Sequence, residues 1–191
     1  MSLMRNLDNS SLGVSPGEDD RQCLLRPVEL SDASAVAAAY RRNRQHLAPW
    51  EPARPEEFFT AAGQEAVIQA KLKQYQLGTE VPWVVTTPRG IAGMVTLSGI
   101  VRGPFLSANL GYWIDQACTG NGLAAGAVAA VVSMATKELN LHRIQAATLP
   151  HNAASQAVLR KSAFQQIGVA PSYLQIAGEW QDHVLFQRIL F

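Results

Sequence analysis

The sequence predicts a single α/β domain built on a mixed sheet, with helices on both faces of that sheet. The second half of the chain alternates strand-like and helix-like segments, whereas the first half holds two consecutive helices and then three strands. The chain has 191 residues, 48% of them hydrophobic and 16% charged, and a chain of this size buries about 70% of its surface as one domain. We expect residues 1–20, which are polar and aperiodic, to form a flexible tail and residues 21–191 to form the domain.

The first half begins with a short strand at Leu24–Val28. Ser31 is placed to cap a helix whose apolar face runs as far as Leu47. A proline-rich loop around Trp50 then leads to a second helix over residues 55–76. The periodicity of these two helices predicts that each buries one apolar face.

The remaining elements follow at short intervals, which leaves no room for a second domain. Three strands are expected at Pro82–Thr86, Ile91–Leu97 and Ala108–Asp115. They are followed by a helix at 122–139, a strand at Arg143–Thr148, a helix at Asn152–Ser162, and strands at Phe164–Val169 and Asp182–Phe191.

The composition excludes several classes of function. A net charge of +1 gives no electrostatic footprint for nucleic acid or for a membrane surface, and no apolar run reaches the ~18 residues of a spanning helix. Cys23 and Cys118 lie far apart, and the four histidines are scattered, so we expect neither a disulfide framework nor a metal site. A reducing cytoplasm is the expected compartment.

Two glycines, Gly120 and Gly122, stand one residue apart between a strand-like segment and an alanine-rich helix. Glycines at such a junction let the backbone come close to a ligand and leave the first N–H groups of the helix available to an anion. The pattern therefore predicts a ligand that carries phosphate.

Three kinds of phosphate-bearing ligand bind to a glycine loop of this kind: a dinucleotide, the nucleotide of a P-loop protein, and coenzyme A. The letters Gly120-x-Gly122-x-x-Ala125 match the dinucleotide fingerprint, but that motif belongs in a first βα turn with an acidic residue about 20 positions on. Here the nearest acidic residue, Glu138, falls inside the helix, and little chain follows. A P-loop fails because no Gly-Lys-Ser/Thr follows. Coenzyme A, whose pyrophosphate needs the same backbone groups, is the third candidate.

The segment after the loop carries a family resemblance. It reads Asn152-x-x-Ser155-x-x-x-Leu159-x-x-x-x-Phe164 and follows a helix and a strand. This resembles the GNAT acetyltransferases, and within them the ribosomal-protein alanine N-acetyltransferases of the RimJ/RimL type, closest to RimJ. Segments that support it over roughly residues 22–190 are Asn43–Pro52, Val101–Gly103, Leu110–Tyr112, Leu141–Ile144 and Ile176–Val184. The wider family has Gln or Arg three residues before the first glycine, where this chain has Ala117.

The resemblance implies a centrally splayed sheet and an acetyl-CoA site. The loop backbone would hold the pyrophosphate, through Cys118, Thr119, Gly120, Asn121, Gly122, Leu123 and Ala124. The backbone of Tyr112, Trp113 and Ile114 would bond the pantetheine arm, and an N–H there would polarise the thioester carbonyl. The structural alternatives are a tight turn for the glycines and ordinary sheet core for the strand. Asn152 fits both a contact to the arm and a helix N-cap.

The catalytic residues are less clearly marked. By resemblance Ser155 lies near the sulfur and protonates or stabilises the departing thiolate; a bond back to a carbonyl is its structural alternative. A RimL-type glutamate would fall near Ser172–Leu174, where this chain has no carboxylate. Glu51 and the Asp182–His183 pair remain as candidate bases, and a surface position or a strand ladder would explain them equally well.

The acceptor site is expected around Trp50 and Glu51, with Phe58 and Phe59 as further walls unless they only pack between helices. An α-amine with a pKa of about 7.7–8.0 is roughly a tenth neutral near pH 7, whereas a lysine at about 10.4 is almost fully charged. A protein N-terminus therefore needs only a modest base. Cys118 invites an acetyl-cysteine mechanism, but no His or Asp lies at a partner spacing, so a passive loop residue is favoured.

The sequence thus predicts an N-acetyltransferase in which an amine attacks acetyl-CoA directly. The resemblance implies the N-terminal alanine or serine of a ribosomal protein as acceptor. One alternative is an enzyme of the same fold that acetylates a small amine, such as an antibiotic or a polyamine. A second is a coenzyme A-binding interaction module without turnover. The oligomeric state is open, with a homodimer among the expected partners.

Overall fold

The computed structural model describes residues 23–191, so the predicted tail at residues 1–20 lies outside the described residues. The described chain forms a seven-stranded sheet in the order β1-β2-β3-β4-β5-β7-β6. The strands are β1 (Leu24–Pro27), β2 (Glu80–Thr87), β3 (Gly90–Val101), β4 (Ser107–Ile114), β5 (Arg143–Thr148), β6 (Gln165–Ile176) and β7 (Glu179–Ile189). The helices are α1 (Ala33–Arg42), α2 (Arg44–Leu47), α3 (Ala61–Gln76), α4 (Leu123–Lys137) and α5 (Ala153–Lys161).

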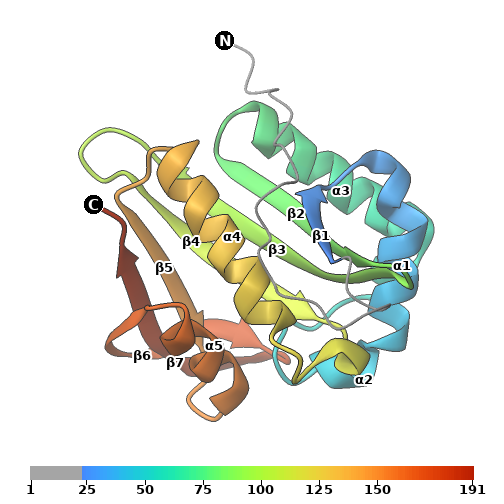
Figure 1. Ribbon diagram of the computed structural model, residues 1–191. Helices are drawn as coiled ribbons and strands as arrows, with labels where there is room; N and C mark the ends of the chain where they lie inside the picture. The colour runs from blue at the N-terminus through green and yellow to red at the C-terminus, as the bar shows by residue number, and fades with distance from the viewer. Residues whose placement is uncertain (1–22) are drawn as a thin grey trace.

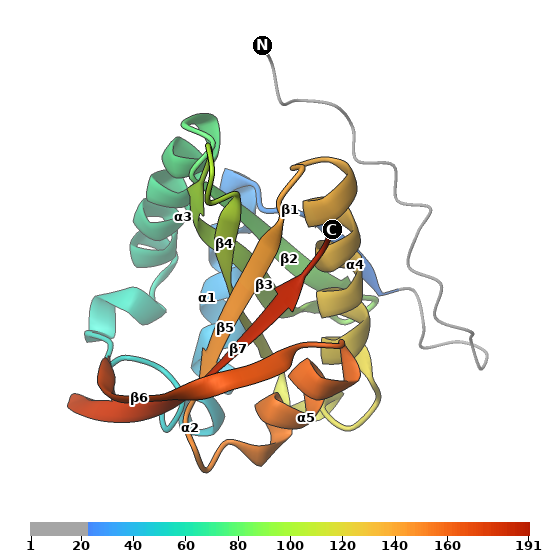
Figure 2. The same ribbon diagram turned by 90° about the vertical axis from the view of Figure 1, so that its left-hand side faces the viewer.

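The helices cover both faces of the sheet, as Figures 1 and 2 show. Val36 and Tyr40 of α1 and Ile68 of α3 pack with Met94 and Trp113 of the sheet in one buried cluster. On the other face, α4 and α5 pack against a larger cluster that includes the central strands; its helical members are Ala127, Val128, Val131, Val132, Ala135 and Leu159. The mixed sheet with helices on both faces confirms the predicted fold class. No helix of the described chain is long and apolar enough to cross a membrane.

The strands β4 and β5 separate along their length, which confirms the expected splay. They are the one parallel pair in the described sheet, and they pair only over Ser107–Asn109 with Arg143–Gln145. Beyond these residues β4 continues to pair with β3 alone, and β5 with β7 alone. A split therefore opens toward the carboxyl ends of the two strands (Figure 1).

Two helix starts differ from the sequence prediction. Ser31 does not cap α1; it lies in a 3-10 turn, where the Asp32 carboxylate instead accepts the Glu29 N–H at 2.8 Å and pairs with Arg26. The helix expected at residues 55–76 is broken at Thr60, whose extended backbone ends a short 3-10 turn and whose hydroxyl caps α3. A carboxylate and a threonine hydroxyl are both strong acceptors for backbone N–H groups around a helix start.

The last two strands are longer than predicted. β6 and β7 form a hairpin whose turn, Ala177–Gly178, has positive φ at both residues. Such a turn matches the twist of the flanking strands, so the ladder continues to the turn itself. Its register shifts between Ala170 and Leu174, because Pro171 has no N–H to donate there. Because a proline is unusual inside a strand, the sequence pattern predicted only the first part of β6.

Candidate functional site

The glycine loop leaves an unbroken run of backbone N–H groups without partners. Within the part of the chain that the structure describes, the N–H groups of residues 120–125 donate no hydrogen bond. Gly120 and Gly122 hold φ of +81° and +79°, and Gly122 is the N-cap of α4. These N–H groups and the positive end of a 15-residue helix suit an anion.

Two residues of the predicted cradle are already engaged. The Cys118 N–H donates to the Asp115 carbonyl at 2.8 Å, and the Thr119 N–H donates to the Gln116 carbonyl at 3.2 Å. Both bonds belong to a 3-10 turn at Gln116–Cys118 that Asp115 caps through the Ala117 N–H. The predicted run of donors is therefore corrected: it begins at Gly120.

The turn before the glycines is tied to the end of α1. Asn43 is buried, and its Oδ1 accepts the Gln116 N–H at 2.9 Å. Asp115 pairs with Arg42 at 2.5 Å. Burial raises the pKa of Asp115, but its contacts with Asn43, the Ala117 N–H and Arg42 lower it by more, so the carboxylate stays charged. The same segment that carries Tyr40 and Arg44 thus holds the glycine loop in place.

The strand segment Tyr112–Ile114 borders the split. Its backbone pairs with β3 on one side, and its register with β5 has already ended at Asn109. The Trp113 ring packs against the Tyr40 ring at 4.7 Å on the α1 side, so this side chain belongs to the core. The backbone edge that faces the split is free to pair with an extended ligand, as a strand edge does.

The first turn of α5 faces the split from the other strand. Asn152 caps this helix, since its Oδ1 accepts the Ser155 N–H at 3.0 Å. The Ser155 hydroxyl lies 2.9 Å from the Tyr112 hydroxyl, which is also 3.2 Å from the Ser155 carbonyl. Burial raises the pKa of Tyr112 to about 12 against the smaller opposing effect of this bond, so the phenol keeps its proton. Sequence reasoning assigned Tyr112 through its backbone and missed its hydroxyl.

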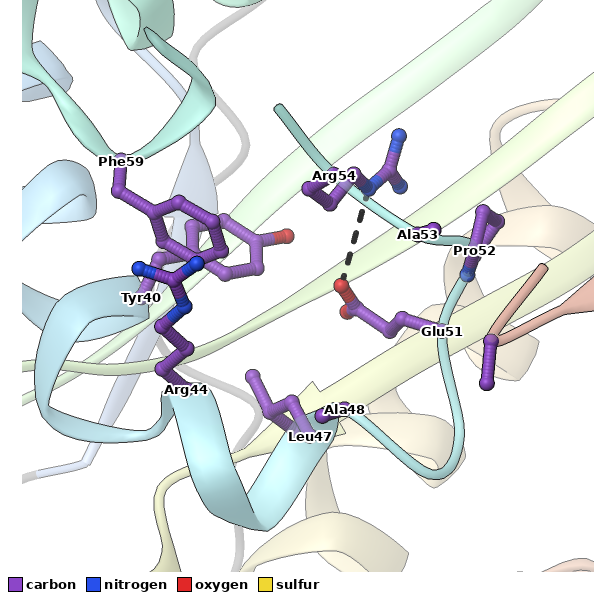
Figure 3. A pocket seen from close by; sticks show the side chains of 10 residues that line it. Tyr40, Arg44, Leu47, Ala48, Glu51, Pro52, Ala53, Arg54 and Phe59 are labelled. Atoms are coloured by element: carbon purple, nitrogen blue, oxygen red, sulfur yellow. Dashed lines mark ion pairs between the residues drawn. The ribbon is translucent and has the colours of Figure 1, made fainter. Parts of the chain in front are cut away.

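A cavity of about 220 Å³ lies beside α1 and α2. Its lining comes from α1, α2, the following loop and the β6–β7 turn: Tyr40, Arg44, Leu47, Ala48, Glu51, Pro52, Ala53, Arg54, Phe59 and Ala177. Figure 3 shows the Tyr40 hydroxyl and the Glu51 carboxylate pointing into the same space. Phe59 therefore lines the cavity as expected, whereas Phe58 is buried against Tyr40 at 4.8 Å.

Glu51 is the carboxylate of this cavity. Its side chain is 20% exposed, and its Oε2 lies 4.0 Å from Arg54 Nε. Burial raises the pKa of the Glu51 carboxyl, and Arg54 only partly opposes this. The Glu51 carbonyl accepts the Ala177 N–H at 3.0 Å, which fixes the loop against the β6–β7 turn. A carboxylate held in this way can accept a proton from an amine near neutral pH.

The other predicted residues do not line this cavity. Trp50 does not line the cavity; its ring lies 5.4 Å from that of His151, next to the cap of α5. His183 is 3% exposed and pairs with Ala170 in the β6–β7 ladder. Its Nδ1 lies within hydrogen-bonding distance, 3.0 Å, of the Gln181 carbonyl oxygen. The position of His183 agrees with its structural alternative, a strand ladder. Burial raises the pKa of Cys118, which disfavours the thiolate form that a nucleophile needs.

Two ring contacts link the segments around the cavity to the segments that border the split. One is Tyr40 against Trp113, and the other is Trp50 against His151. Packed side chains therefore connect the walls of the carboxylate cavity to β4 and to the start of α5. Within residues 23–191, no three His, Cys, Asp or Glu side chains group as metal ligands do.

Comparison with known proteins identifies this arrangement. The model of the acetyltransferase (GNAT) domain family matches residues 22–165. The chain belongs to the GNAT acetyltransferases. It is therefore an acetyl-CoA-dependent N-acetyltransferase, as the resemblance implied.

Relatives lie within the predicted subgroup. The chain is 35% identical over 164 residues to the ribosomal protein uS5-alanine N-acetyltransferase of Escherichia coli, covering 85% of this chain and 84% of the relative. It is similar to the crystal structure of the ribosomal-protein-S5-alanine acetyltransferase of Vibrio fischeri, with a TM-score of 0.85, 36% identity, and 88% and 93% of the two chains covered. RimJ of Mycobacterium smegmatis in complex with a CoA-disulfide matches with a TM-score of 0.84 and 29% identity, over 87% and 81%.

Proposed function

We propose that this GNAT enzyme acetylates the N-terminal amine of a protein, an alanine or serine of a ribosomal protein. The observation that carries this is the Glu51 cavity, whose one carboxylate is partly buried and has a raised pKa. Support for a ribosomal acceptor comes from the relatives, two of which act on the alanine of ribosomal protein uS5 or S5. A homodimer stays a prediction.

The donor would bind along the split. The partnerless N–H groups from Gly120 to Ala124 would hold the pyrophosphate, with Asn121, Gly122 and Leu123 between them. The pantetheine arm would add to the free edge at Tyr112, Trp113 and Ile114, near Asn152. Because the backbone makes these contacts, we expect that Ala117, at the position where the family has Gln or Arg, lowers the affinity for the donor only slightly. Cys118 and Thr119 would support the loop conformation through their turn.

The reaction would be a direct transfer. The neutral amine attacks the thioester carbonyl carbon, the new C–N bond forms, and the C–S bond breaks. Glu51 accepts the proton that the amine nitrogen loses and passes it to solvent, and its raised pKa suits this role. A β4 backbone N–H stabilises the oxyanion, and the Ser155 hydroxyl donates to the departing thiolate, which then takes a proton from solvent.

The cavity favours a terminal amine over the alternatives. An α-amine is already partly neutral, so one partly buried carboxylate is enough. A polycation would call for several carboxylates, but two arginines, Arg44 and Arg54, line this cavity beside Glu51. Their charge disfavours polyamines and aminoglycosides as acceptors.

Thiol release tests the proposal. The protein is given acetyl-CoA with hexapeptides that begin with Ala, Ser, Leu or N-acetyl-Ala, and separately with spermidine and kanamycin. We expect release with the Ala and Ser peptides only. Release with spermidine or kanamycin alone would establish the small-amine alternative. Tight coenzyme A binding without release for any amine would establish the non-catalytic module.

A further inference from the structure

The Tyr112 hydroxyl has a position that cofactor binding by its backbone does not explain. Tyr112 lies three residues past the end of the β4–β5 register, on the strand that borders the split. Its hydroxyl contacts both oxygens of Ser155, Oγ at 2.9 Å and the carbonyl oxygen at 3.2 Å. The contact therefore links β4 to α5 across the split, and it does so through Ser155, the side chain proposed to face the sulfur.

The two hydroxyls carry two hydrogens, which permit two arrangements without movement of heavy atoms. In the first, the phenol donates to the Ser155 carbonyl and the Ser155 hydroxyl donates to the phenol oxygen. In the second, the phenol donates to Ser155 Oγ, and the serine hydrogen points away from the tyrosine. The first arrangement gives the Ser155 hydroxyl a hydrogen-bond acceptor when no thiolate is present. The second leaves the serine hydrogen available to donate to the sulfur.

We propose that Tyr112 is a positioning residue for the leaving group: its hydroxyl donates to Ser155 Oγ in the transition state and directs the serine hydrogen to the sulfur. The proposal rests on the acetyl transfer and the Ser155 role given above. No proton changes owner in this step, because the thiolate leaves with a hydrogen bond and is protonated by solvent.

The hydrogen-bond chain also explains why a tyrosine suits this position. A donor that receives a hydrogen bond on its own oxygen becomes a better donor, because each bond polarises the next. The phenol keeps its proton across the working pH range, since burial raises the pKa of Tyr112 to about 12. Phenylalanine would fill the same space and lose only the hydroxyl.

The test is a double-mutant cycle of Tyr112→Phe and Ser155→Ala. One hydrogen bond worth about 1–1.5 kcal/mol corresponds to roughly a tenfold change in rate. We expect Tyr112→Phe to lower kcat for an Ala-initial peptide about tenfold, with the Kd for coenzyme A unchanged. In the Ser155→Ala background the same substitution should change kcat less than twofold. Tyr75→Phe, a half-buried tyrosine on α3, is the matched control and should keep the wild-type kcat.

Each result decides the matter. A Tyr112→Phe enzyme with wild-type kcat would overturn the inference and leave the proposed function intact. Equal losses of kcat in both backgrounds would also overturn it, because they would mean that Tyr112 only braces β4 against α5. A wild-type chain that releases no thiol with any peptide would overturn the proposed function together with the inference.

Discussion

The glycines of the loop give a prediction whose size follows from the structure. Gly120 and Gly122 have φ of +81° and +79°, and a Cβ at either position would meet no atom within 4 Å. Alanine at either site therefore clashes with nothing, and its cost is the left-handed backbone alone, about 1–2 kcal/mol. If the loop relaxes in the free protein, donor binding must restore it. We expect Gly120→Ala and Gly122→Ala each to raise the Kd for coenzyme A about 5- to 30-fold.

A matched control separates this effect from general destabilisation. Gly78, after the end of α3, has a φ of +72° and equally open space around it. Gly78→Ala should lower the melting temperature and leave the Kd for coenzyme A unchanged. Calorimetric titration with coenzyme A measures all three variants, and circular dichroism checks their folding. Folded Gly120→Ala and Gly122→Ala variants that bind like the wild type would refute the backbone cradle.

Two further predictions concern the carboxylate and the cap. Glu51→Gln should lower kcat at least about 100-fold, the size of a lost general base, and a smaller loss would exclude that role. Because the pKa of Glu51 is raised in the folded state, its charge costs stability above the unfolded value near 4.5; the variant should melt higher than wild type at pH 7 and equally at pH 4. Asn152→Asp keeps the oxygen that caps α5 but loses the amide donor, so we expect an unchanged melting temperature and weaker coenzyme A binding; unchanged binding would leave Asn152 as a cap only.

Local patterns in the sequence were enough to predict the glycine loop and the helix starts on the side proposed for the donor. The glycine loop, the start of α4 and the Asn152 cap each depend on neighbours within a few residues, and such signals survive without knowledge of the fold. The loop's donors were predicted two residues too early. The turn before the glycines is held partly by Asn43, which accepts the Gln116 N–H from 73 residues away in the sequence. A local pattern does not reveal such a contact.

The acceptor side depends on contacts between distant segments. Glu51 becomes a partly buried carboxylate only because α1, α2 and the β6–β7 turn close around its loop. Its bond to Ala177 joins residues that no local pattern relates. The Tyr112–Ser155 pair arises in the same way, from a strand and a helix that are 43 residues apart. Sequence could therefore name Glu51 as a candidate but could not rank it above His183.

The most direct test of the account is the position of the acetyl group on a peptide that offers both kinds of amine. The enzyme is incubated with acetyl-CoA and a peptide that begins with Ala and contains one internal Lys, and the product is sequenced by tandem mass spectrometry. Transfer to a terminal amine at the Glu51 cavity predicts acetyl on the alanine nitrogen alone. Acetyl on the lysine, with a free alanine nitrogen, would contradict it.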